Sequence, residues 1–197
     1  MAVLELAAII LVVTLGGYYI IKYKKEFQYF RFLNLHIVNS SEEMHKTMAV
    51  GLYHRFKQEP DEAGPIETSY RFEKFVAKVM VNYYGGTTTV TNNSDDYGIH
   101  IIHDREDGQY LGQVMCYDPD KLVPYDPIAL IHSQMVKRGA KGGFVVTTSD
   151  FSPQAKKYSQ DLNIEIINGR KLTEYWIKGL EAALNSERDE ELEPGLI

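Results

Sequence analysis

The chain has 197 residues, of which 44% are hydrophobic and 12% aromatic, so it can fill a folded core and is not a disordered chain. Its single cysteine, Cys116, excludes an intramolecular disulfide and a cysteine-rich zinc site, and it fits a reducing compartment. The net charge of −6 argues against a general binder of polyanions.

The first predicted element is an apolar helix over residues 1–22, which contains the run AVLELAAIILVVTLGGYYII. A helix needs about 20 apolar residues to cross the hydrocarbon core of a bilayer. Three lysines follow directly, Lys22, Lys24 and Lys25, and basic residues beside a membrane span stay on the cytoplasmic side. The pattern predicts a single-pass helix in the inner (cytoplasmic) membrane, with the N-terminus outside and the soluble domain in the cytosol. A cleaved signal peptide is disfavoured because its basic residues would precede the apolar run.

Four further regions follow the apolar run. Residues 23–57 predict a basic and aromatic helical neck, with a second helix beginning near Ser41. Residues 58–68 are acidic and contain two prolines and a glycine, which is typical of a linker. Residues 69–184 carry alternating helix and strand signals, and the acidic tail 185–197 is predicted to be disordered.

Within residues 69–184 the predicted order of elements is α-β-β-β-α-β-α-β-α. An apolar stripe with helical spacing runs from Ser69 to the glycines at 85 and 86. The predicted strands are 87–90, 98–102, 109–117, 143–149 and 164–169, and the later helices are 127–139, 152–162 and 170–184. The order predicts an α/β domain with a mixed sheet flanked by helices.

Polar residues gather around the second and third predicted strands. Asp95 and Asp96 precede the second strand, and the third strand places Gln113 and Met115 on one face because alternate residues of a strand share a face. An acidic loop that enters a strand beside such a pair of positions is typical of metal-dependent phosphodiesterases. In those enzymes carboxylates hold Mg²⁺ and a lysine stabilises charge near the attacking water.

Four segments in this region carry the motifs of a known family: FEKFVAKVMVNYYGG, DYGIHII, GQVMCY and GGFVVTTSDFSPQAKKYSQDLNIEIINGRKLTEYW. In this order, over residues 69 to about 176, they resemble the Mrr family of restriction endonuclease-like domains, which have the PD-(D/E)xK nuclease fold. The resemblance implies a restriction-endonuclease-like fold. It matches Glu73, Asp96 and Gln113 to surviving positions of the catalytic motif, and it implies Mg²⁺ as the cofactor of an active form.

The sequence departs from the family at two positions that carry the chemistry. His100 stands where the family has its metal-binding aspartate, and Met115 stands where it has its lysine. Imidazole has no negative charge and suits Zn²⁺ better than Mg²⁺, and a thioether supplies neither a positive charge nor a strong hydrogen-bond donor. Loss of one pre-organised electrostatic group costs about 10²–10³ in rate. No resident cofactor is therefore expected, and Mg²⁺ only if the enzyme is active.

Three further interpretations concern a zinc site, a replacement for the missing lysine and a DNA-binding surface. Glu73, Asp96 and His100 form a candidate zinc set, and a hydrogen-bonded core histidine is the other interpretation of His100. Lysines elsewhere in the domain are candidates to replace the missing one: Lys74, Lys78 and Lys121. A basic patch around two adjacent helices is a candidate DNA-binding surface, although solvated helix faces explain it equally well. Its members are Lys137, Arg138, Lys141, Lys156 and Lys157.

The leading hypothesis is a membrane-anchored, catalytically degenerate Mrr-like domain that acts as a DNA- or protein-binding module in a bacterial or phage DNA-handling or defence system. One alternative is an active, metal-dependent endonuclease of the type IV restriction kind, with a rearranged site. The other is a protein-interaction scaffold at the membrane. The expected partners are the membrane, DNA and proteins of a membrane-associated complex, and the oligomeric state stays open.

Overall fold

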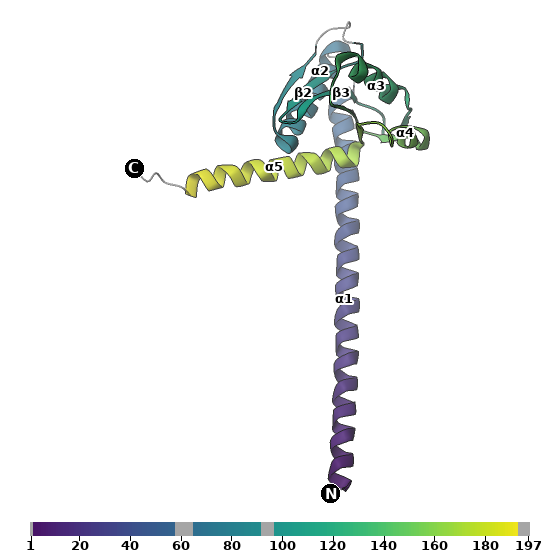
Figure 1. The fold of residues 1–197 in the computed structure, drawn as a ribbon, viewed down its shortest axis with the longest axis vertical. Helices are drawn as coiled ribbons and strands as arrows, with labels where there is room; N and C mark the ends of the chain where they lie inside the picture. The colour runs from purple at the N-terminus through teal and green to yellow at the C-terminus, as the bar shows by residue number, and fades with distance from the viewer. Residues whose placement is uncertain (1, 58–64, 92–96, 193–197) are drawn as a thin grey trace. The chain divides into compact units, whose positions relative to one another are not determined.

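The computed structural model describes residues 2–57, 65–91 and 97–192, and the chain divides into two compact units, Met1–Glu43 and Met44–Ile197. The first helix, α1, spans Ala2–Phe56 and so contributes to both units. The second unit contains every other helix and strand of the described residues, and it holds the predicted site (Figure 1).

The apolar run of residues 2–21 is not an element of its own. It forms the first part of the 55-residue helix α1, and the lysines that follow the run lie inside this helix rather than at its end. Within the described residues, no helix is both long and apolar enough to cross a membrane. The expected transmembrane helix over residues 1–22 is therefore wrong, and the roles that it implied for Lys22, Lys24 and Lys25 fall with it.

A five-stranded mixed sheet forms the centre of the second unit, in the order β1-β2-β3-β5-β7. Three strands pair antiparallel: β1 (Thr87–Val90), β2 (Ile101–Arg105) and β3 (Gly108–Met115). Two further strands continue the sheet parallel to β3: β5 (Gly142–Thr147) and β7 (Ile164–Ile167). The helices are α2 (Pro65–Tyr84), α3 (Asp126–Arg138), α4 (Pro153–Tyr158) and α5 (Gly169–Leu192). The mixed α/β architecture is thus confirmed in the predicted order.

Helices cover both faces of this sheet, and each face has its own apolar cluster. On one face, α2, α5 and the last turns of α1 bury Phe72, Val76 and Leu172 against Val114 and Phe144. On the other face, α3 and α4 bury a second set of apolar side chains: Ile128, Ile131 and Ala155 against Leu111 and Val145. Because side chains alternate along a strand, neighbouring residues of β3 belong to different clusters. The site lies where β2 and β3 meet.

Several elements differ from the prediction. The strand predicted at 98–102 begins only at Ile101, because Tyr97 (φ 51°) and Gly98 (φ 80°) both adopt the left-handed conformation, which interrupts a strand. Ser41, the predicted start of a second helix, lies inside α1. The helix predicted to end at residue 184 continues to Leu192. Two two-residue strands, β4 (Leu122–Val123) and β6 (Asp150–Phe151), form a small parallel sheet that was not predicted.

Candidate functional site

Glu73 and His100 lie close together although 27 positions separate them in sequence. Glu73 is on α2 and is buried, at 8% exposure, and its Oε1 atom lies 3.5 Å from Nδ1 of His100. His100 directly precedes β2, at the point where the left-handed turn of Tyr97 and Gly98 delivers the chain into the sheet. Two positions that the family resemblance assigns to catalysis are thus brought into contact.

The backbone of Val114 also holds the His100 ring. Nδ1 lies 2.9 Å from the Val114 carbonyl oxygen and 3.2 Å from the Val114 nitrogen, so it donates to the one or accepts from the other, depending on the tautomer. The His100 backbone is fixed as well, because its N–H donates to Gly112 (2.8 Å) and its carbonyl accepts from Thr91 (2.9 Å). His100 therefore ties β2 to β3 at the end of their ladder.

Gln113 and Met115 lie on the face of β3 that α3 covers. Met115 packs against the cluster that contains Leu111 and Val145, as an apolar side chain would. The Gln113 amide lies near the Tyr97–Gly98 turn: a Cβ atom on Gly98 would lie 3.6 Å from Gln113 Nε2. Gln113 Oε1 is buried and has no hydrogen-bond partner among the described residues. A buried unpaired amide oxygen is costly, so this atom marks an unsatisfied position in the site.

The donors that the structure describes do not fit Mg²⁺. Asp96, like Asp95, lies outside the described residues, so its contribution to the predicted metal set is not described. Elsewhere in the described chain, no group of three or more histidine, cysteine, aspartate or glutamate side chains could hold a metal ion. The remaining donors are one carboxylate (Glu73), one buried amide oxygen (Gln113) and a histidine whose Nδ1 is engaged by backbone. Mg²⁺ demands near-octahedral ligation by oxygen atoms, and only two of these three side chains, Glu73 and Gln113, offer oxygen.

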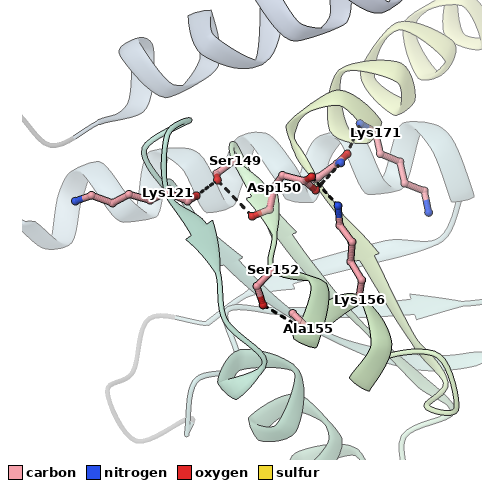
Figure 2. A network of polar contacts seen from close by, with 8 residues as sticks. Lys121, Ser149, Asp150, Ser152, Ala155, Lys156 and Lys171 are labelled. Carbon is pink, nitrogen blue, oxygen red and sulfur yellow. Dashed lines mark hydrogen bonds and ion pairs between the residues drawn. The ribbon is translucent and has the colours of Figure 1, made fainter.

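The predicted DNA-binding patch is partly neutralised. Lys141 pairs with Asp107 at 3.2 Å, and Lys156 pairs with Asp150 at 2.6 Å (Figure 2). The Lys137 ammonium lies 4.6 Å above the Tyr97 ring. Arg138 and Lys157 complete the patch at the end of α3 and on α4. Much of the positive charge is therefore engaged within the protein, which weakens the patch as a phosphate-binding surface.

One cavity, of about 580 Å³, adjoins the site and was missed by sequence reasoning. Met115 lines it from β3, Lys121 from the following turn, and Tyr53 and Lys57 from the end of α1. Of the three lysines considered as replacements for the family lysine, Lys121 alone lines this cavity with Met115, whereas Lys74 packs over the Tyr70 ring at 4.1 Å. The contribution of α1 could not be read from sequence because it depends on how that helix packs on the sheet.

The chain was compared with known families and structures. Residues 67–176 match the family model Mrr_cat, described as "Restriction endonuclease". No curated protein matches the chain significantly.

Three solved structures are similar. The DNA modification-dependent restriction endonuclease AspBHI aligns with a TM-score of 0.53 and 14% identity, over 72% of this chain and 36% of that one. The MspJI restriction endonuclease in complex with a 27-mer oligonucleotide gives 0.44 and 22%, over 65% of this chain and 34% of that one. The protein of unknown function AF1548 gives 0.44 and 18%, over 50% and 57%.

The likeness to AspBHI concerns the fold alone, and this chain spans only about a third of the length of that enzyme. The family match is more informative, since residues 67–176 are more than half of the chain and include nearly all of α2, the whole five-stranded sheet, and α3 and α4. They also include Glu73, His100, Gln113 and Met115. The chain therefore belongs to the Mrr-type restriction endonuclease family.

Proposed function

We propose that this chain is a catalytically degenerate member of its family, which binds DNA without hydrolysing it and serves in a DNA-handling or defence system. One observation carries the proposal: His100 and Met115 have structural contacts in place of the family chemistry. The His100 ring is held by the Val114 backbone and Glu73, and Met115 packs into an apolar cluster. Neither side chain brings the negative or positive charge that metal-dependent phosphodiester cleavage needs.

The electrostatic effect of the two substitutions does not depend on the exact position of the DNA. In a phosphoryl transfer, charge develops on the oxygens around phosphorus, and catalysis depends on groups that already face that charge. A loss of about 10²–10³ in rate for each such group would leave a doubly substituted site nearly inert. DNA binding does not require these catalytic groups, because cations that contact the backbone phosphates provide most of the affinity for DNA.

The test uses the full chain and measures binding and cleavage separately. Duplex DNA, with and without modified bases, is titrated over a range of salt concentrations, and supercoiled plasmid is incubated with Mg²⁺ or Mn²⁺. We expect salt-sensitive binding and no nicking. Metal-dependent nicking that disappears in Glu73→Ala would instead establish an active enzyme with a rearranged site. Absence of binding at the lowest salt would favour a protein-interaction scaffold.

A second arm restores the family residues. His100→Asp together with Met115→Lys returns one carboxylate and one ammonium to the site. If the DNA-binding groove is intact, the double variant is expected to nick plasmid in the presence of Mg²⁺. Each single variant is expected to nick plasmid more slowly than the double variant. Melting curves show whether the variants fold, since His100→Asp removes the ring that contacts Val114. A folded double variant that binds DNA but never nicks it would mean that the catalytic site lacks further groups besides the family aspartate and lysine.

A further inference from the structure

The cavity beside Met115 has walls from two parts of the chain. Tyr53 lies in the last turn of α1 and Lys57 directly follows that helix. Met115 ends β3, and Asp118 and Lys121 lie in the turn after it. Both walls lie in the unit Met44–Ile197. The first wall precedes residue 67, where the family match begins, so this cavity is not built from the family motif alone. Its volume of about 580 Å³ is in the range of small-molecule sites.

The turn over residues 117–121 is held in place by the end of β5. The Thr148 hydroxyl accepts from the Tyr117 N–H at 2.8 Å and donates to the Tyr117 carbonyl at 2.6 Å. The Ser149 hydroxyl donates to the Lys121 carbonyl oxygen, and the Lys121 N–H donates to the Asp118 carbonyl at 2.9 Å. Figure 2 shows the Lys121 ammonium extending away from this network, while its backbone faces Ser149. The ammonium is thus carried by a fixed backbone.

The charges around the cavity favour an anion. Asp118 is its one carboxylate, and that group already accepts from the Tyr53 hydroxyl at 3.4 Å and from the Asp120 N–H at 3.0 Å. No carboxylate of the described residues forms an ion pair with Lys57 or Lys121. Two lysines therefore line the cavity together with one carboxylate that has its own partners. Compact lysine charges suit phosphate oxygens.

Two other uses of the cavity are disfavoured by its chemistry. Cys116 is no reactive nucleophile, because burial raises the pKa of its thiol to about 11 and keeps it protonated. A single engaged carboxylate gives a metal cation too few ligands. The partly exposed rings of Tyr53 and Tyr117 also line the cavity, and such rings are the surfaces on which nucleobases stack.

We propose that this cavity binds the phosphate of a nucleotide through Lys57 and Lys121, either in a free nucleotide or within a nucleic-acid strand. These lysines would bring positive charge to the end of β3 from outside the family motif. The proposal rests on the proposed function only where the phosphate belongs to DNA, since a free nucleotide would bind through the same groups.

The test compares two charge-neutralised double variants of the full chain. Lys57→Gln/Lys121→Gln removes both cavity cations, and Lys24→Gln/Lys25→Gln removes the same charge from exposed positions of α1 that do not line the cavity. Binding of thymidine 5′-monophosphate is measured by calorimetry, and binding of a fluorescent single-stranded oligothymidine is measured by anisotropy over a range of salt concentrations. Equal melting temperatures show that each variant is folded.

We expect the cavity variant to bind its ligand about tenfold more weakly for each lysine lost, with a shallower salt dependence, and the control to stay near wild type. If the cavity variant binds the monophosphate more weakly than wild type, the cavity recognises a free nucleotide. If it loses affinity only for the oligonucleotide, the cavity recognises a phosphate within a nucleic-acid strand. Oligonucleotide binding that both variants weaken equally, or that neither affects, overturns the cavity proposal and leaves the DNA-binding function standing. No binding of either probe to the wild-type chain overturns the cavity proposal, whereas the duplex titration described above decides the DNA-binding function separately.

Discussion

His103 is fully buried in β2, and both of its ring nitrogens have partners. Nε2 lies 2.8 Å from the Gly85 carbonyl oxygen, and Arg105 Nε donates to Nδ1 at 3.2 Å. A ring that accepts at Nδ1 and donates at Nε2 is neutral. Burial lowers the pKa of His103 from its ordinary value, and the bond to Gly85 offsets this only in part.

This burial predicts a loss of stability in mild acid. The unfolded chain titrates near the ordinary histidine pKa of about 6.5, so between that pH and the lower pKa of the folded form it binds more protons than the native protein. The contribution of neutral His103 to the free energy of unfolding is fully present above about pH 6.5. Below that pH the free energy of unfolding falls by up to about 1.4 kcal/mol per pH unit. Melting curves from pH 7.5 to 5.5 test this. Replacing exposed His54 with Asn should keep the slope, whereas a folded His103→Asn should flatten it, and an unchanged slope would contradict the assignment.

Glu165 is the centre of a second polar group, on β7. It accepts hydrogen bonds from Tyr84 (2.7 Å) and Tyr175 (2.5 Å), and its Oε1 lies 2.7 Å from Lys171 Nζ. Burial acts to raise the pKa of Glu165, but hydrogen bonds from Lys171, Tyr175 and Tyr84 outweigh it and hold the pKa below its usual value. The carboxylate is therefore charged in the native protein.

We predict that Glu165→Ala lowers the free energy of unfolding by about 2–4 kcal/mol, because three donors lose their shared acceptor in a partly buried place. The matched control is Glu174→Ala, which breaks an exposed pair with Lys178 one helical turn away and should cost about 0.3–0.5 kcal/mol. Urea unfolding of both variants gives the comparison. Equal losses would show that the Glu165 group contributes no more than a surface ion pair.

At the scale of elements, Thr148 connects two loops at one end of the sheet, because its hydroxyl bonds both the N–H and the carbonyl of Tyr117. Thr148→Val keeps the shape and removes both bonds, and we expect a loss of about 1–3 kcal/mol. Hydrogen exchange should rise in residues 117–121 more than in the rest of the chain. Thr89→Val, on an exposed position of β1, is the control. Unchanged exchange in the turn would mean that Ser149 alone holds it.

The elements that sequence predicted well have strong local patterns. The apolar stripe of α2 and the β-branched run of β5 define both elements. Ser152, the first residue of the helix predicted at 152–162, is the N-cap of α4, since its side chain accepts from the Ala155 N–H at 3.1 Å. The short pair β4 and β6 has no such pattern, since two residues give no period. The continuity of α1 through Ser41 was missed because a serine that favours a helix start does not forbid a helix interior.

The site was predictable only in part. The family motif assigned Glu73 and His100 to one site, and the two side chains lie 3.5 Å apart. The motif could not show that the Val114 backbone holds the His100 ring, because that contact depends on where the left-handed turn before β2 places the chain. It also could not show Lys57 beside Met115, since no local signal links a helix end to a strand more than fifty residues later.

For the whole molecule, the last turns of α1 are part of the core of the second unit. Leu52 and Phe56 are buried at 4% and 5% exposure, and the Phe56 ring lies 5.2 Å from that of Phe72 and 5.3 Å from that of Phe75. The family match begins only at residue 67. The folded unit is therefore larger than the matched family domain, and it needs a segment that the family motif does not contain.

A chain that starts at Met44 should accordingly melt like the second unit of the full protein, whereas one that starts at Pro65 should be strongly destabilised or aggregate, because it exposes the apolar surface that α1 covers.

In the full chain, Phe56→Ala should lower the free energy of unfolding by about 3–5 kcal/mol, the range for large-to-small changes in a core. Val136→Ala, at a side chain 72% exposed on α3, should have little effect. Circular dichroism melts decide between these. If the chain from Pro65 melts at as high a temperature as the one from Met44, the end of α1 is not needed to stabilise the fold. The cavity wall that Tyr53 and Lys57 form would then not be a fixed part of the second unit.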